Sequence, residues 1–150
     1  MPIPDPVKDA QFYDGVPLRR IAAFVVDTAV VTVLSLGVLL VGLIIGLVTL
    51  GLGVVVAIPV LAAIGFLYRW TMLSGHSATL GMLLLGLEVR RSDGEQLDQT
   101  TAFVHAAGFT GCLYIPVLLI GGWLSVLLTA ERRMLHDLPL GTVVINRPLG

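Results

Sequence analysis

Charged residues are scarce in this chain, and their scarcity excludes most soluble folds. Only 13% of the 150 residues are Asp, Glu, Lys or Arg, and 56% are hydrophobic, whereas an ordinary soluble domain has about 25% charged residues. The net charge of −1 offers no electrostatic support for a nucleic-acid partner. The composition therefore predicts one small membrane domain whose main partner is the lipid bilayer.

Cysteine and the features of a signal peptide are also nearly absent. Because Cys112 is the single cysteine, no disulfide can form within the chain, and this residue is interpreted as a small packing side chain. Three aspartates accompany one lysine in the first eighteen residues, so no cleavable signal peptide is expected. Residues 1–17 are expected to form a flexible tail, and residues 18–150 a single membrane domain.

Long apolar runs dominate the rest of the sequence. In the run Ile21–Tyr68 the only charged residue is Asp27. A membrane crossing needs roughly 20 apolar residues, so this run predicts two transmembrane helices, at about 18–43 and 49–73, with a glycine-rich turn between them. The GxxxG of Gly42–Gly46 lies at that turn and is interpreted as hinge glycines, with a dimer face as the alternative.

The third apolar region, residues 102–130, is too long for one crossing and too short for two. Basic residues occur in the N-terminal, central and C-terminal segments but not in the turn between the first two helices, so the positive-inside rule predicts that those three segments are cytoplasmic. A single third crossing would put Arg132 and Arg133 outside. The charges therefore favour two short helices that enter and return, meeting near Pro116–Gly122, with one long helix as the alternative.

Two β-rich runs flank this third region. Residues 87–91 alternate apolar and charged side chains, the pattern of a half-exposed strand, and residues 141–146 form the second run. We expect the two runs to pair as a small cytoplasmic sheet at the membrane surface. The predicted fold is thus an all-α integral protein of the inner membrane with both termini cytoplasmic, two long helices, a broken third hydrophobic region and a two-strand element.

Asp27 is the first candidate for a functional side chain. A carboxylate in hydrocarbon costs on the order of 2.5–3.5 kcal/mol, so it normally has a partner or a role. Arg20 lies two helical turns earlier on the same helix face and is the expected partner. Asp27 is expected either to hold helices together through an arginine or to bind a cation or proton inside the bundle.

Further candidates lie at the ends of the third region. His105 is near its start, His136 follows it beside Asp137, and Arg132 and Arg133 form a basic cluster suited to anionic lipid headgroups. Three histidines without a short repeat do not make a metal site on spacing alone, so no metal or cofactor is expected. The sequence has no paired serine and base and no carboxylate pair at catalytic spacing, so no enzyme activity is expected.

Three segments occur in an order that resembles a known family. They run from Arg20 to Asp27, from Thr79 to Leu87, and from Leu135 to Val144. This order resembles the RDD family of small, mostly bacterial membrane proteins, named for one arginine and two aspartates. Arg20, Asp27 and Asp137 fall on those positions. The chain departs from the pattern at Met82, where the family commonly has a lysine, so the loop lacks that cation.

The resemblance implies an architecture more than an activity, and two functions stay open. In one, the protein has a structural or assembly role, and Arg20, Asp27 and Asp137 form a buried ionic clamp. In the other, it is a cation/proton transporter or transporter subunit: Asp27 binds the cation or proton, Arg20 tunes the pKa of Asp27, and Asp137 gates the cytoplasmic mouth. Because a lone bundle this thin leaves little room for a pathway, transport would require a homo-oligomer or another membrane protein as partner.

Overall fold

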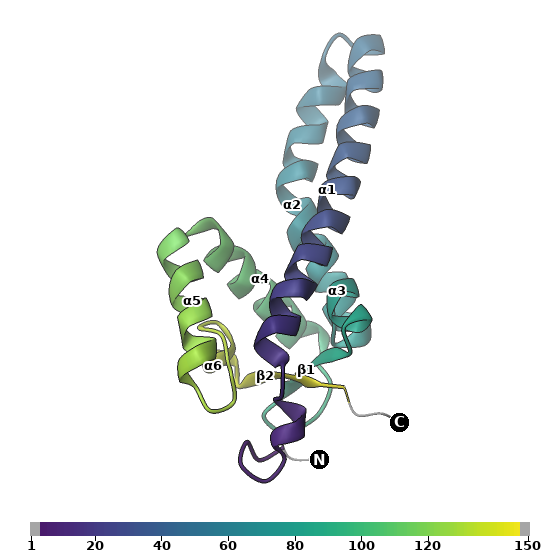
Figure 1. The fold of residues 1–150 in the computed structure, drawn as a ribbon. Helices are drawn as coiled ribbons and strands as arrows, with labels where there is room; N and C mark the ends of the chain where they lie inside the picture. The colour runs from purple at the N-terminus through teal and green to yellow at the C-terminus, as the bar shows by residue number, and fades with distance from the viewer. Residues whose placement is uncertain (1–3, 148–150) are drawn as a thin grey trace.

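A pair of long helices stands beside a bent pair of shorter helices, with a two-stranded sheet at one end of the molecule (Figure 1). The computed structural model describes residues 4–147. Its elements in chain order are η1 (Ala10–Phe12), α1 (Val16–Val48), α2 (Leu52–His76), α3 (Leu80–Leu84), β1 (Leu87–Arg91), α4 (Gln99–Tyr114), α5 (Pro116–Leu128), α6 (Asp137–Leu140) and β2 (Thr142–Asn146).

The two long helices predicted from the apolar run are confirmed. α1 has 33 residues and α2 has 25, and both are long and apolar enough to cross a membrane. Pro17 lies in the first turn of α1, where its missing N–H costs no helical hydrogen bond. Both helices end later than predicted, at Val48 and His76, because glycine in a long apolar segment does not by itself end a helix, and α2 begins at Leu52 rather than at about residue 49.

The glycines of the predicted hinge pack the two long helices together instead. Gly42 and Gly46 lie inside α1, so their interpretation as hinge residues is wrong. A Cβ built on Gly42 would lie 2.6 Å from that of Ala57, and one on Gly53 would collide with the backbone of α1. The chain reverses at Leu50 and Gly51, which have φ values of 52° and 101°. The small residues therefore give a close contact within one chain.

The third hydrophobic region is divided into α4 and α5, whose axes differ by 112°. Ile115 separates the helices and Pro116 opens α5, a position that suits its fixed φ. The break therefore comes at the start of the predicted segment, and Gly121 and Gly122 lie inside α5. Such a bent pair is compatible with a broken span or with a re-entrant loop.

The predicted pairing of the two β-rich runs is confirmed. β1 and β2 are antiparallel, with Leu87 opposite Asn146 and Arg91 opposite Thr142. Tyr13, which the sequence analysis assigns to the tail, packs against two residues of β2. The Asn146 side-chain amide donates to the backbone carbonyl of Asp14 at 2.9 Å. The segment around η1 therefore lies against the sheet, beneath α1 (Figure 1).

Burial is concentrated at the sheet end of the molecule. The main core joins residues of α1, α2, α4 and both strands: Val16, Ala23, Leu73, Leu87, Val89, Leu97, Ala102, Ala106 and Val144. Toward the α1–α2 turn, large apolar side chains such as Leu47 and Ile58 are exposed, as expected for a lipid-facing surface. The candidate polar residues lie where the elements converge.

Candidate functional site

Asp137 is the centre of a saturated polar network. Its carboxylate is fully buried at the start of α6. Oδ2 accepts from Nη2 of Arg20 at 2.7 Å and from the backbone N–H of Met134 at 3.0 Å. Oδ1 accepts from the Thr142 hydroxyl at 3.1 Å and lies 2.9 Å from Nε2 of His105. These four contacts match the number of lone-pair sites that a carboxylate offers.

Arg20 connects the start of α1 to the loop that follows α5. It is 5% exposed, and its Nη1 donates to the backbone carbonyl of Arg132 at 2.8 Å. Arg132 has a φ of 52°, and the loop after α5 turns sharply at this residue. The next residue, Arg133, accepts from the Ser125 hydroxyl through its own carbonyl at 2.9 Å. Arg132 thus contacts Arg20 through its backbone rather than through its guanidinium group, and Arg133 binds Ser125 through its backbone.

Burial and charge fix the protonation states around Asp137. Burial alone would raise the pKa of this carboxyl, but the Arg20 guanidinium and the His105 hydrogen bond hold it well below its usual range. Burial lowers the pKa of His136 to about 4, against the attraction of Asp137. At neutral pH the site therefore contains a carboxylate anion beside a neutral His136 imidazole.

The two histidines and Asp137 form a group that sequence spacing did not predict. One ligand-type atom from each of His105, His136 and Asp137 lies within 4.8 Å of the others. The two imidazole rings meet edge to face, with centroids 4.9 Å apart. The carboxylate is already bound by the Arg20 guanidinium, and that positive charge opposes a second cation at the same oxygens.

Asp27 holds the short helix α3 against α1. It is 1% exposed. Its Oδ1 accepts from the Tyr68 hydroxyl and from the backbone N–H of Gly81, both at 2.8 Å. Its Oδ2 accepts from the Thr79 hydroxyl at 2.6 Å. Thr79 is also the N-cap of α3 and accepts from the N–H of Met82 at 3.3 Å, so Asp27 supports the helix start through both side chain and backbone.

Gly81 makes this close approach sterically feasible. A Cβ at this position would collide with the backbone carbonyl of Ala23 and would lie 2.9 Å from Oδ1 of Asp27. The glycine in the segment that resembles the RDD family is therefore explained by packing. Any larger residue would push α3 away from α1 and stretch the hydrogen bond to Asp27.

The predicted pairing of Arg20 with Asp27 is wrong. Arg20 pairs with Asp137, and among residues 4–147 no ion pair involves Asp27. Two turns of helix put Arg20 and Asp27 on one face, but each meets a different partner segment. The three residues of the expected clamp therefore divide into one ion pair and one separate hydrogen-bonded carboxylate.

Arg69 is the site residue that sequence reasoning missed. It is 8% exposed, and its Cζ lies 3.7 Å from the centroid of the Phe109 ring. On sequence alone it is only one of the basic residues of the central segment, which is predicted to be cytoplasmic. Its position in the second predicted transmembrane helix could have indicated a role, because a charged arginine in a membrane segment normally needs a partner, as Asp27 does.

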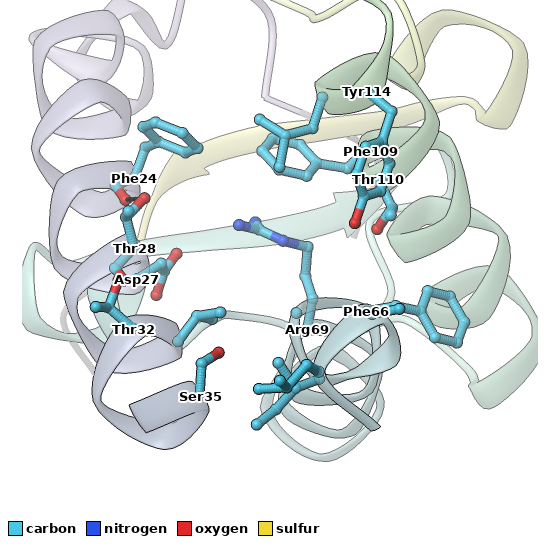
Figure 2. A pocket seen from close by; sticks show the side chains of 16 residues that line it. Phe24, Asp27, Thr28, Thr32, Ser35, Phe66, Arg69, Phe109, Thr110 and Tyr114 are labelled. Carbon is cyan, nitrogen blue, oxygen red and sulfur yellow. Dashed lines mark hydrogen bonds between the residues drawn. The ribbon is translucent and has the colours of Figure 1, made fainter. Parts of the chain in front are cut away.

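A cavity of about 200 Å³ separates Arg69 from Asp27. Figure 2 shows the Arg69 guanidinium extending into this space from α2, facing the α1 wall that carries Phe24, Asp27 and Thr28. Its remaining lining comes from α1, α2 and α4, and includes Val31, Thr32, Ser35, Leu61, Ala62, Ile64, Gly65, Phe66, Phe109, Thr110, Leu113 and Tyr114.

A smaller void lies between the two polar networks. Its volume is about 30 Å³, and its lining includes Arg20, Asp27, Arg69, His105 and His136. A space of roughly 10–15 Å³ is enough for one water molecule. The Asp137 and Asp27 centres are thus neighbours across a space that can hold water, without direct contact between the two carboxylates.

Comparison with known proteins relates both networks to one family. The model of the RDD family matches residues 15–141, which include Arg20, Asp27 and Asp137. No curated protein and no solved structure gives a significant match to the chain. The matched segment runs from the residue before α1 to the residue after α6 and contains the site residues described above except Thr142.

Proposed function

The chain belongs to the RDD family, and we propose that it is an inner-membrane protein with a structural or assembly role. In this proposal Arg20, Asp27 and Asp137 stabilise the sheet end of the bundle and catalyse no reaction. Membrane association itself rests on two helices that are long and apolar enough to cross.

The hydrogen bonds that the two buried carboxylates accept carry this proposal. Asp137 has four contacts and Asp27 has three, and every partner of Asp27 comes from α2 or the α3 segment. Binding an ion at either carboxylate would displace donors that hold α3 or α6 in place. A buried carboxylate used this way contributes order among elements that are far apart in sequence.

Orientation follows from the distribution of basic residues. The N-terminal, central and C-terminal basic segments meet at the sheet end, whereas the α1–α2 turn at the opposite end has no Lys or Arg (Figure 1). The positive-inside rule therefore favours a cytoplasmic sheet and cytoplasmic termini.

The sheet also supports a third region that enters and returns. β1 precedes α4 and β2 follows α5, and the two strands pair with each other. A chain that left the sheet and came back to it must begin and end the α4–α5 segment on one side of the membrane. We therefore propose a re-entrant pair rather than a third crossing.

Cation or proton transport is the second candidate, because Asp27 lines a cavity. The same wall carries the hydroxyl groups of Thr28, Thr32 and Ser35, and hydroxyl and carboxylate oxygens are ligands for hard cations. In this case Asp27 is the ion-binding group. The path would be completed by a second copy of the chain or by another membrane protein.

Asp27→Asn tests the two candidates together. The substitution keeps the shape of the side chain but replaces one acceptor oxygen by an NH2 donor, which then faces either the Thr79 hydroxyl or the pair of donors from Tyr68 and Gly81. The structural role predicts a loss of about 1–3 kcal/mol in unfolding free energy, with no sodium or proton flux in liposomes containing the wild-type protein. Asp93→Asn, at an exposed position, is the matched control.

The opposite pattern would favour transport. Flux in the wild type that disappears in Asp27→Asn, while the variant unfolds at the wild-type temperature, would refute the structural role of Asp27. Flux that is also lost in Asp93→Asn would point to a general effect of surface charge and would leave Asp27 without a special role in transport.

A further inference from the structure

Arg69 has the features of a binding residue rather than of a structural cation. We propose that it binds the acidic headgroup, a carboxylate or a phosphate, of an amphipathic molecule that occupies the cavity between α1, α2 and α4. This inference concerns a different residue and a different ligand from the structural role proposed for Asp27 and Asp137, and it does not depend on that role.

The first argument is that the N–H donors of Arg69 have no acceptor within the part of the chain that the structure describes. A guanidinium has five N–H donors, and Arg69 is 8% exposed. Among residues 4–147, no hydrogen bond or ion pair engages these donors. The Phe109 ring covers one face of the guanidinium, and a cation–π contact leaves the N–H groups at its edge free. Arg20, which is equally buried, has both a carboxylate and a carbonyl as acceptors.

The second argument is that Asp27 is already engaged. It accepts from two hydroxyls and one backbone N–H. No ion pair joins it to Arg69 across the cavity. The guanidinium of Arg69 therefore extends into the cavity, with Asp27 on the opposite wall and no ion pair between the two residues (Figure 2). A bidentate acidic group is the partner whose geometry matches the edge of this guanidinium.

The third argument is the shape and lining of the cavity. Arg69 lines the cavity together with polar side chains such as Asp27, Thr28 and Thr110, and apolar side chains including Val31, Leu61, Ile64 and Leu113 form much of the remaining wall. The volume of about 200 Å³ is below the range of roughly 300–1,000 Å³ typical of sites that enclose a whole drug-sized ligand. The space therefore suits an acidic headgroup and the adjoining part of an apolar chain, with the rest of that chain outside in lipid.

Binding of dodecyl phosphate to the full-length protein in neutral detergent tests the proposal. Native mass spectrometry counts the protein molecules that retain the amphiphile across a concentration series. Dodecanol is the probe with the same chain and no acid, and inorganic phosphate is the probe with the acid and no chain. Dodecyl phosphate is expected to bind, and dodecanol to bind about tenfold more weakly or not at all.

Two variants place the site at Arg69. Arg69→Gln removes the charge and is expected to weaken dodecyl phosphate binding about tenfold or more. Gly65→Leu keeps Arg69 but fills the cavity, and a Cβ at this helical glycine meets only Val31, at 3.7 Å. It should weaken binding similarly. Arg91→Gln removes an arginine that pairs with Asp93 at the surface and should bind as the wild type does.

The outcomes distinguish the source of the acid. Competition by inorganic phosphate identifies a site that recognises the free anion as well, whereas no competition identifies a lipid-type ligand that needs its chain. Equal binding of dodecyl phosphate and dodecanol, or unchanged binding in both Arg69→Gln and Gly65→Leu, overturns the proposal. If Arg69→Gln does not fold, Gly65→Leu decides the question, because it retains the arginine and the helix.

Discussion

The guanidinium of Arg20 and the carboxylate of Asp137 lie 2.7 Å apart, although 117 residues separate them in the chain. Their side chains are 4% and 0% exposed. The pair joins the first turns of α1 to the start of α6, and Thr142 extends the contact into β2. One ion pair thus ties the beginning of the membrane domain to its end.

Arg20→Gln should therefore destabilise the fold strongly. It leaves the Asp137 carboxylate buried without its cation, and breaking a buried pair in this way costs roughly 3–5 kcal/mol. Unfolding of the purified protein in detergent, followed by circular dichroism, measures the loss. Arg19→Gln is the control, because Arg19 is exposed and makes only long contacts at 3.4 and 3.5 Å. Equal stability of the two variants would contradict this account.

The elements of this fold were predictable where composition decides them. A crossing needs a long apolar run, and residues 21–68 supply two. The alternating run at 87–91 and the second β-rich run were predicted to pair because charge placement put both on one side. The break at Pro116 follows from a property of one residue, its fixed φ and missing N–H. These features depend on local sequence.

The partners of the buried charges were not predictable in the same way. Spacing along α1 relates Arg20 to Asp27, but the acceptor of Arg20 comes from α6 and the donors to Asp27 come from residues 41 to 54 positions later. Such contacts depend on how α2 and α3 turn about α1. The orientation of α2 about α1 also directs Arg69 into the bundle. The sequence alone therefore shows that this residue is charged, but not that it faces a cavity.

Gly81→Ala tests the close contact between α3 and α1. The added methyl group would collide with the Ala23 carbonyl, so α3 must shift and the hydrogen bond from its N–H to Asp27 must lengthen. We expect a loss of about 1–3 kcal/mol, the usual cost of overpacking. Thermal unfolding measures it.

Gly111→Ala is the matched control for that prediction. Gly111 is also helical, in α4, and a Cβ there meets nothing within 4 Å. Alanine in a helix interior is favoured over glycine by roughly 0.5–1 kcal/mol, so this variant should be as stable as the wild type or more so. A Gly81→Ala protein with wild-type stability would show that α3 does not need its present position.

Stability should fall in mild acid because of His136. Burial lowers the pKa of this imidazole from 6.5 to about 4, so between these pH values the unfolded chain binds more protons than the folded one. The contribution of His136 to the free energy of unfolding is then fully present above pH 6.5 and is lost as the pH falls toward 4. The loss amounts to about 3 kcal/mol for a shift of this size.

His136→Gln should remove most of this pH dependence. Glutamine does not titrate, so the free energy of unfolding of the variant should change little between pH 6.5 and 4. His76→Gln, at an exposed position at the end of α2, should retain the wild-type slope. If the slope is unchanged in His136→Gln, another group is responsible for acid sensitivity.

Accessibility from the two sides of the membrane tests the proposed orientation. Asp93 and Asp5 are exposed near the sheet end, whereas Leu50 is 100% exposed at the α1–α2 turn, at the other end of the molecule (Figure 1). In a Cys112→Ser background, a membrane-impermeant thiol reagent applied to intact cells should label Leu50→Cys but not Asp5→Cys or Asp93→Cys. Permeabilising the cells should make Asp5→Cys and Asp93→Cys accessible to the reagent.

The same experiment also tests the re-entrant third region. Asp93 precedes α4, so a cysteine at Arg147, just after β2, gives the side on which the α4–α5 segment ends. With a re-entrant pair, Arg147→Cys is protected in intact cells together with Asp93→Cys. Labelling of Arg147→Cys from outside would require α4 and α5 to cross the membrane as one span. It would also separate β1 from β2, in conflict with their antiparallel pairing.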